Sequence, residues 1–465
     1  MTILFQTIST GIAGYLCMIM GIMFTWPSST VRLFSSTNTT LNRPMTETEV
    51  ALLGSLPSIS ALISIPCVSY IIETIGKKYC CMMFSVLQVI NWVIITVSYN
   101  VEAILTAIFL SGLCNGILMV LPIYVSEICQ DSIRGRMTSG AMVFCKIGML
   151  VSYLMGGYLK YDVMNYVCLS MTVLGVVLIS FLKESPMHLM RKGHENEAAQ
   201  AIAFYRGTST NSKLVKEELQ VLRRVLNPDL GDTTPEEEKL RSDLKENSKV
   251  SWWQFLKKSR STRKALIVIL LLNTTVIFQG MIVAQVYAEP LFAEAVPSMS
   301  STNCSVIFTL VTITAGFFGA FLIEQAGRRL LMIYASICTG ISCVILGTQI
   351  QLHWGPHWVT AIFMYIFSLT NTCGAGTVPC VLAAEIFLPE IKSIASMLVI
   401  EWSLVCSFTV LFIFNPLVIT IGLGPVFYFF AVACFLSAIF CIFFLPETKG
   451  LTVDVIQTIF AKSKV

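Results

Sequence analysis

The residues best suited to chemistry are acids and cations that flank a glycine between two long apolar runs. The sequence around Glu324 reads I-E-Q-A-G-R-R-L, and a near copy around Glu73 reads I-E-T-I-G-K-K-Y. Side chains of these types form ion pairs and hydrogen bonds that can hold helices in one arrangement. The two copies lie 251 residues apart in a chain of 465 residues. A charged turn duplicated at that distance predicts a chain built from two related halves.

Two further charged signatures repeat with nearly the same offset. P-I-Y-V-S-E ends at Glu127 and is matched by the A-E-I-F around Glu385, and E-S-P at Glu184 is matched by P-E-T at Glu447. The halves are therefore parallel repeats. We expect the charged residues of the three signatures to form gating latches between helices of one half: Glu73, Lys77, Lys78, Glu127, Arg134, Glu184, Glu324, Arg328, Arg329, Glu385, Lys392 and Glu447. The alternative is that the cations only set the membrane topology.

The amino-acid composition indicates that most of this chain lies in a lipid bilayer and not in water. It is 55% hydrophobic and only 12% charged, whereas a soluble domain carries about 25% charged residues. We therefore predict a multi-span membrane protein with the lipid bilayer as a partner. The net charge of +4 gives no reason to expect nucleic acid. The sixteen cysteines fall mostly in apolar runs without metal-ligand spacing, so we expect neither a disulfide framework nor a metal site.

Twelve apolar runs are long enough to cross a bilayer as helices. They lie at 5–28, 49–71, 80–99, 102–124, 138–158, 163–182, 264–288, 304–323, 330–351, 358–384, 394–415 and 423–445. The predicted fold is an all-α membrane protein of two six-helix bundles related as parallel repeats. The predicted domains are an N-terminal bundle at 1–182, a central cytosolic loop with short helices at 183–263, a C-terminal bundle at 264–446 and a cytosolic tail at 447–465.

Cations orient the spans. Lysine and arginine concentrate in the even-numbered links and the C-terminal tail, which places these links and both termini in the cytosol. Asn38 and Asn303 begin sequons on the opposite side and are candidate glycosylation sites. In the central loop, Glu195–Tyr205 and Lys213–Leu226 are predicted helices. Ser251–Leu256 is predicted to lie at the membrane interface, although the basic run after it also suits protein docking.

The motifs E-T-I-G-K-K, P-I-Y-V-S-E, E-S-P, E-Q-A-G-R-R, G-A-G-T-V-P-C and P-E-T-K-G-L-T together resemble the sugar porter family of the major facilitator superfamily. The resemblance covers nearly the whole chain. Short tails and the Trp26-Pro27 pair make it most similar to insect facilitated trehalose transporters. It implies alternating-access movement of a small solute with no chemistry performed on it, and hence no enzyme activity. No Walker A sequence is present, so neither ATP nor another cofactor is expected.

The resemblance also implies where the sugar contacts lie, and there the chain departs from the family. Met142 replaces a glutamine in span 5, Ile282 an asparagine in span 7, Cys380 a tryptophan in span 10 and Glu401 an asparagine in span 11. Apolar side chains cannot satisfy the hydroxyls of a polyol. Lys146 lies one helical turn after Met142 and adds a charge. The candidate substrate-binding residues are therefore Met142, Lys146, Gln279, Ile282, Cys380 and Glu401.

Three functions follow from these residues. The first is a monomeric, facilitative carrier in the plasma membrane for a small solute, such as trehalose or a hexose. Span 1 contains no acid, which argues against proton coupling. The second is a carrier of an organic ion that uses Lys146 and Glu401, although either charge could instead have a structural role. The third is a sensor that binds a solute without moving it.

Overall fold

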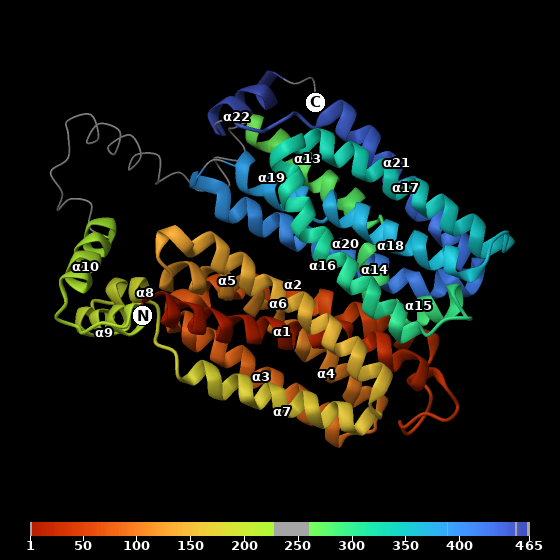
Figure 1. The fold of residues 1–465 in the computed structure, drawn as a ribbon, viewed down its shortest axis with the longest axis horizontal. Helices are drawn as coiled ribbons and strands as arrows, with labels where there is room; N and C mark the ends of the chain where they lie inside the picture. Colours follow the sequence, from red (N-terminus) through yellow and green to blue (C-terminus); the bar gives the residue numbers. More distant parts are fainter. Residues whose placement is uncertain (1, 227–259, 388, 452, 463–465) are drawn as a thin grey trace. The chain divides into compact units, whose positions relative to one another are not determined.

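The computed structural model describes residues 2–226, 260–387, 389–451 and 453–462, and the regular elements in this part of the chain are all helices (Figure 1). Eleven of these helical stretches are long and apolar enough to cross a membrane by length and composition. Lipid offers no hydrogen-bond partner, so a spanning backbone must satisfy its own N–H and C=O groups, as an α-helix does. The predicted all-α membrane fold is confirmed.

The first six predicted spans are all helical in the structure. They correspond to α1 (Thr2–Ser35), α2 (Glu47–Ile75), α3 (Lys77–Val97), α4 (Val101–Leu113) with η1 (Cys114–Gly116) and α5 (Ile117–Ile128), α6 (Asp131–Tyr158) and α7 (Tyr161–Ser180). The fourth span is interrupted by the 3-10 turn at Cys114–Gly116. Three further helices follow span 6: α8 (Pro186–Arg191), α9 (Glu195–Arg206) and α10 (Lys213–Leu226).

The remaining predicted spans are also helical, and two of them are broken. They correspond to α13 (Arg260–Ile277) with α14 (Met281–Val286) and α15 (Ala288–Ala295), α16 (Ser301–Ala326), α17 (Arg328–Leu352), α18 (His357–Cys373) with α19 (Val378–Ile386), α20 (Pro389–Ile421) and α21 (Leu423–Phe444). The tail adds α22 (Val453–Lys462). The breaks fall in the seventh span at Gly280, where φ is +87°, and in the tenth span after Cys373.

The two helices predicted in the central loop are confirmed as α9 and α10. Val215 of α10 is fully buried, and Leu219 and Leu222 pack against the same cluster, which includes Ile202 of α9. The two leucines and Val215 share the apolar face of α10, and most of the charged residues of α10 lie on its other side. The apolar face of α10 therefore packs against α9. The interfacial helix predicted at Ser251–Leu256 lies outside the described residues.

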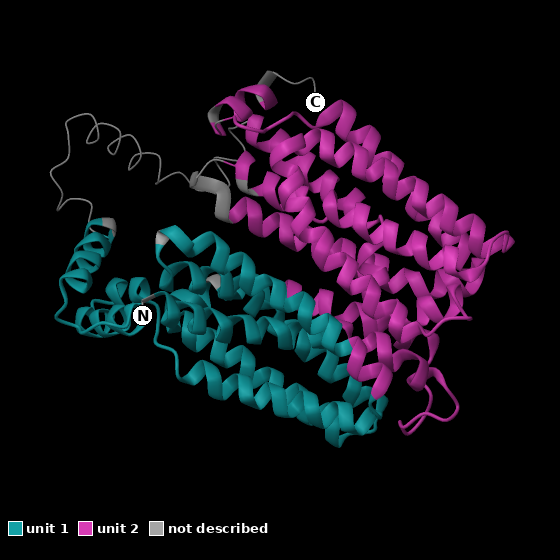
Figure 2. Ribbon diagram, viewed as in Figure 1, with its two compact units in different colours: residues 1–24, 63–152, 159–247 teal, residues 25–62, 153–158, 248–465 magenta. Residues whose placement is uncertain are grey.

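The chain divides into two compact units (Figure 2). Unit 1 comprises residues 1–24, 63–152 and 159–247, and unit 2 comprises residues 25–62, 153–158 and 248–465. Helices α1, α2 and α6 each contribute to both units. The predicted boundaries of the four sequence domains stay predictions.

Within unit 1, helices α1 and α6 approach so closely that glycine is required at the contact. A Cβ added to Gly21 would lie 1.9 Å from the Cys145 carbonyl oxygen, and one added to Gly148 would lie 2.0 Å from the Met18 carbonyl oxygen. Small residues let spanning helices gain van der Waals contact where lipid supplies no hydrophobic drive. This contact fixes α6, which carries two of the candidate substrate-binding residues.

Candidate functional site

In unit 1, Glu184 caps the first turn of α3. Its Oε1 accepts the backbone N–H of Lys77 at 2.9 Å, and its Oε2 accepts that of Lys78 at 3.0 Å. The preceding Gly76 has φ +96°, and a Cβ there would lie 2.5 Å from Glu184 Oε2. A carboxylate at this place satisfies N–H groups that the helix leaves unpaired and meets the positive end of the helix dipole.

Lys77 links this cap to the end of α5. Its Nζ lies 2.8 Å from Glu127 Oε2, although the lysine side chain is only 5% exposed. The Ser185 hydroxyl donates a hydrogen bond to the same oxygen of Glu127. Helices α3 and α5 and the segment after α7 are thereby joined by five residues, which we call the Glu184 cluster: Lys77, Lys78, Glu127, Glu184 and Ser185.

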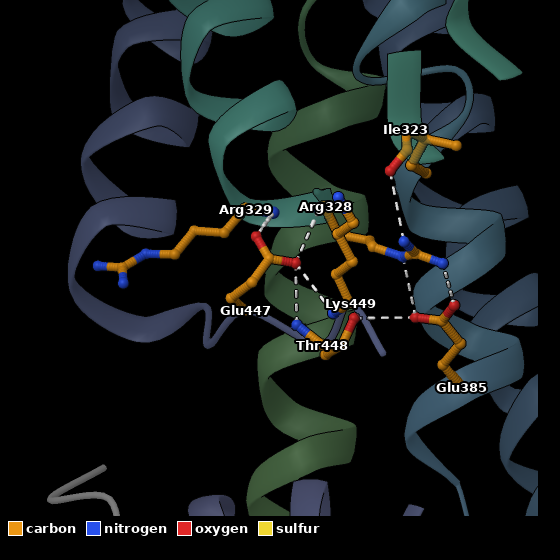
Figure 3. Close-up of polar contacts among 7 residues, drawn as sticks. All are labelled: Ile323, Arg328, Arg329, Glu385, Glu447, Thr448 and Lys449. Carbon is orange, nitrogen blue, oxygen red and sulfur yellow. Dashed lines mark hydrogen bonds and ion pairs between the residues drawn. The ribbon is translucent and has the colours of Figure 1, made fainter. Parts of the chain in front are cut away.

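Glu447 repeats the cap in unit 2, at the first turn of α17 (Figure 3). Its Oε1 accepts the backbone N–H of Arg328 at 2.9 Å, and its Oε2 accepts that of Arg329 at 3.0 Å. The backbone N–H groups of Thr448 and Lys449 also donate to Oε1, at 3.0 and 3.1 Å. Burial alone would raise the pKa of the Glu447 carboxyl, but these four donors outweigh it and hold the pKa below its ordinary value of 4.5.

Arg328 then joins the cap to α19, as Lys77 joins the first cap to α5. Its Nη2 lies 2.5 Å from Glu385 Oε1 and its Nε 3.2 Å from Oε2. The Thr448 hydroxyl donates to Glu385 Oε2 at 2.8 Å. Arg328, Arg329, Glu385, Glu447 and Thr448 form the Glu447 cluster, in which each residue has the role of its counterpart in unit 1.

The second cation of each signature binds a helix end instead of an acid. Lys78 Nζ donates to the Ser180 carbonyl oxygen at 3.0 Å, and Arg329 Nη2 donates to the Ile442 carbonyl oxygen at 2.6 Å. Both carbonyls lie in the last turn of their helices, α7 and α21. Carbonyls there have no partner within the helix, and a cation satisfies them.

Four of the predicted gating residues are not members of the two clusters as defined above. Glu73 and Glu324 are exposed and make no hydrogen bond or ion pair with the described residues. Arg134 is exposed at the start of α6 and lines a cavity of about 600 Å³ together with Glu127, Arg206 and Glu218. Lys392 lies in α20, and its side chain is outside the described part.

The candidate solute residues on α6 lie in unit 1. Met142 is half-buried and packs against the apolar cluster of that unit. Lys146 is half-buried as well, and it forms no hydrogen bond or ion pair with the side chains or backbone that the structure describes. An unpaired cation in a spanning helix is costly, so it generally faces a cavity or a solute.

In unit 2, the side chain of Gln279 is hydrogen-bonded to neighbouring helices. It is fully buried, its Oε1 accepts the Asn371 side-chain amide at 2.8 Å, and its Nε2 lies 3.5 Å from the Ser336 hydroxyl. These bonds stabilise the break of the seventh span at Gly280. Ile282 follows the break, half-buried in α14.

Cys380 and Glu401 differ in their surroundings. Cys380 is exposed and lines a cavity of about 380 Å³ in unit 2, together with residues of α13 and α20. Glu401 is half-buried, and its Oε1 is buried with no hydrogen-bond partner among the described residues. An unpaired buried carboxylate oxygen is destabilising, which favours a role for Glu401 outside simple packing.

The last part of the seventh span is also tied to other spans within unit 2. The backbone N–H of Glu289 in α15 donates to the Ser28 hydroxyl of α1 at 2.8 Å. Tyr287 packs on α2 so closely that a Cβ on Gly54 would lie 2.1 Å from its hydroxyl oxygen. Broken helices with such contacts are a common device for gating in transporters.

Comparison with known families decides the class of this protein. The family model for "Sugar (and other) transporter" matches residues 2–460. The chain belongs to the sugar transporter family. This family, the sugar porters of the major facilitator superfamily, consists of transporters of sugars and other solutes, and not of enzymes.

Among curated relatives of this sugar porter are three insect proteins. It is 25% identical to the facilitated trehalose transporter Tret1 of Drosophila yakuba, over 87% of this chain and 46% of that protein. It is 24% identical to Tret1 of Polypedilum vanderplanki, over 91% and 82%, and 25% identical to a Tret1-2 homolog of Drosophila sechellia, over 83% and 77%. The chain thus spans about half the length of the first relative and most of the other two.

Solved structures agree on the fold of this sugar porter. The inward-open form of the xylose transporter XylE from E. coli matches with a TM-score of 0.77 and 18% identity, covering 97% of this chain and 98% of that one. A partially occluded inward-open form matches with a TM-score of 0.75. The predicted major facilitator fold is confirmed.

Sequence reasoning missed two members of the sugar porter's clusters. Ser185 and Thr448 directly follow the capping acids, and their hydroxyls bind Glu127 and Glu385. The signal was present, since E-S and E-T occupy matching positions in the third repeated signature. The predicted sequons remain predictions: Asn38 is exposed between α1 and α2, and Asn303 Oδ1 accepts the Tyr158 hydroxyl at 2.9 Å.

Proposed function

We propose that this chain is a facilitative, alternating-access carrier of a small solute, in the first instance a sugar such as trehalose or a hexose. The observation that carries the proposal is the pair of matching clusters, each of which joins three segments of its own unit through one capping acid. Caps and ion pairs that join helix ends can hold one of two arrangements of a unit, and a transport cycle shifts the population between such arrangements. The names of the insect relatives support trehalose as the first solute to test.

Uncoupled movement is the simplest mode. A proton-coupled carrier needs a titratable acid in the path. Span 1 contains none, since the first acid of this chain is Glu47, beyond the apolar part of α1. Glu401 in span 11 is the acid that could serve if transport were coupled. Cation placement supports cytosolic termini and cytosolic clusters. We assign the protein to the plasma membrane as a monomer, with a solute and the bilayer as its partners and with neither ATP nor nucleic acid.

A second candidate solute class is an organic ion. Two half-buried charges in predicted spans, Lys146 and Glu401, favour it. Lys146 forms no hydrogen bond or ion pair with the described residues, and Glu401 Oε1 has no hydrogen-bond partner among them. A charged solute would compensate one of them. A non-transporting sensor would keep the clusters and bind without flux.

The test is uptake and counterflow in proteoliposomes that contain the purified full chain. Radiolabelled trehalose, glucose and a panel of organic cations and anions are compared with liposomes that lack protein. Saturable trehalose or glucose counterflow supports the proposal. Saturable flux of an ion alone replaces it with the second candidate, and thermal stabilisation by a solute without any flux identifies a sensor.

A further inference from the structure

The cavity in unit 2 lies between α13, α19 and α20 and has a volume of about 380 Å³. This is within the range of roughly 300–1,000 Å³ that small-molecule sites occupy. Its wall on α20 includes Val399, Ile400 and Leu404, and Pro379 and Ala383 lie on α19. At helical spacing these three side chains share one face of α20 with Ser396, Ser403 and Ser407, so the α20 wall combines aliphatic side chains with serine hydroxyls.

The strongest polar group in the wall is already engaged. Asn273 Nδ2 donates to the Ile269 carbonyl oxygen at 3.0 Å, and the Ser403 hydroxyl lies 3.3 Å from Asn273 Oδ1. The same hydroxyl lies 2.8 Å from the Val399 carbonyl oxygen. The wall then offers the hydroxyls of Ser396 and Ser407 and the Cys380 thiol. These are few partners for a sugar, whose several hydroxyls lose water on binding and need replacement hydrogen bonds.

We propose that this cavity binds the apolar part of an amphipathic solute, such as the ring of an aryl glycoside, and that a free sugar does not fill it. The proposal rests on the proposed function as a small-solute carrier and specifies the class of solute. An aromatic ring gains from leaving water against Val399, Ile400 and Leu404, whereas a bare polyol face does not.

Cys380 provides a reporter in the wall itself. Its side chain is exposed, as are those of Cys67 and Cys338, while the other thirteen cysteines are buried or half-buried. In a background carrying Cys67→Ser and Cys338→Ser, the rate of maleimide labelling therefore measures access to the cavity. Adding Cys380→Ser must abolish that labelling.

The experiment measures protection of Cys380 by phenyl β-D-glucopyranoside, glucose and trehalose in the purified full chain. We expect the phenyl glycoside to halve the labelling rate at a concentration about tenfold or more below that needed with either free sugar. Leu404→Gln should remove this difference, whereas Val405→Gln, at the next residue and outside the wall, should keep it. Labelling without ligand at the rate of the Cys67→Ser, Cys338→Ser background shows that each variant retains the cavity.

Two results would overturn the proposal: equal or better protection by glucose or trehalose, or labelling of Cys380 that the phenyl glycoside leaves unchanged. Flux is measured separately so that the two proposals can fail independently. Protection by the phenyl glycoside without any flux supports the cavity assignment and removes the carrier function. Sugar flux without such protection supports the carrier function and overturns the cavity assignment.

Discussion

Arg328 and Glu385 form a two-point ion pair, with Nη2 2.5 Å from Oε1 and Nε 3.2 Å from Oε2. At the matching place in unit 1, Lys77 meets Glu127 through a single nitrogen at 2.8 Å. A guanidinium binds both oxygens of a carboxylate in a fixed plane, whereas an ammonium acts as a point charge. The Glu447 cluster is therefore held in a more specific geometry than the Glu184 cluster.

Arg328→Lys should change how fast the protein cycles while leaving solute affinity nearly unchanged. The substitution keeps the charge and removes one of the two contacts, and a hydrogen bond to a charged group contributes about 1.5–3 kcal/mol. We expect a change of about tenfold or more in the counterflow rate, since 1.4 kcal/mol corresponds to a factor of about ten. Counterflow at saturating solute, with a parallel binding measurement, tests this expectation.

The matched control is Glu324→Gln, which neutralises an exposed acid of the same signature that has no bonded partner among the described residues. It should behave as the wild type does. A counterflow rate of Arg328→Lys within error of the rates of the wild type and of Glu324→Gln would show that the ion pair does not limit the transport cycle.

The turn glycines make a prediction about stability. Gly76 and Gly327 adopt φ +96° and +85° with ψ near 169° and 167°, a region that is essentially restricted to glycine. A Cβ on Gly327 would also lie 2.7 Å from Glu447 Oε2. Alanine at either position should destabilise the protein by about 1–3 kcal/mol, which a lowered thermal unfolding midpoint in detergent would show.

Gly316→Ala serves as the comparison for these glycines. A Cβ there has no neighbour within 4 Å, and its φ is not positive. Alanine is the better helix former in the interior of α16, so this variant should be neutral or slightly stabilising. Equal losses in all three variants would remove the structural role that we assign to Gly76 and Gly327.

Much of this structure follows from sequence, and the exceptions have physical causes. Apolar length and charge placement predict the spans and the four acids of the two clusters, because a bilayer imposes strong constraints on composition. Spacing along the chain cannot tell which acid meets which cation, since the partners come from different spans. Glu73 and Glu324 therefore looked equivalent to Glu127 and Glu385, although they bind no described residue.

The solute positions were the least predictable part. Glutamine is a residue type that can bind sugar hydroxyls, but the Gln279 side chain is hydrogen-bonded to Asn371 and Ser336. These bonds lie at a helix break that hydrophobic periodicity does not reveal. The break depends on Gly280 at φ +87°, and an isolated glycine in an apolar run is compatible with an unbroken helix. Chemical type alone thus does not separate a ligand from a packing residue.

The lowered pKa of Glu447 predicts how its cap depends on pH. A carboxyl whose pKa is below 4.5 in the folded protein contributes stability above 4.5 and loses it as the pH falls through the lowered value. The difference in unfolding midpoint between wild type and Glu447→Gln should therefore be constant from about pH 8 to pH 5 and shrink below pH 4.5. A difference that already declines between pH 7 and pH 5 would contradict the assigned shift.

Gly54 makes a prediction about the broken seventh span. Its missing Cβ leaves room for the Tyr287 ring, which also stacks on Phe414 with centroids 5.5 Å apart. Gly54→Val should prevent this packing and disfavour the state that the structure shows, slowing counterflow by about tenfold or more. Adding Tyr287→Ala should restore part of the rate, because it removes the clash. Failure of the double variant to recover, with normal expression, would show that Gly54 acts through another contact.

Lys146 and Glu401 make the last prediction, which concerns selectivity. A charge in the middle of a spanning helix costs about 2.5–3.5 kcal/mol on insertion scales, and such charges generally serve a pathway or a solute. If the solute is an ion, Lys146→Thr should abolish flux of anions and spare cations, and Glu401→Asn should do the opposite. If the solute is neutral, each substitution restores a family-like polar group and should leave or raise sugar counterflow.

Lys160→Thr is the control for charge alone, since Lys160 lies in the exposed link before α7. Counterflow competition with a neutral, an anionic and a cationic solute in the three variants distinguishes the cases. Opposite effects of Lys146→Thr and Glu401→Asn on the two ions would identify both residues as solute ligands. The same selectivity in all three variants would instead assign both charges to the stability of their helices, because a residue that only stabilises a helix changes how much protein folds and leaves unchanged which solute it prefers.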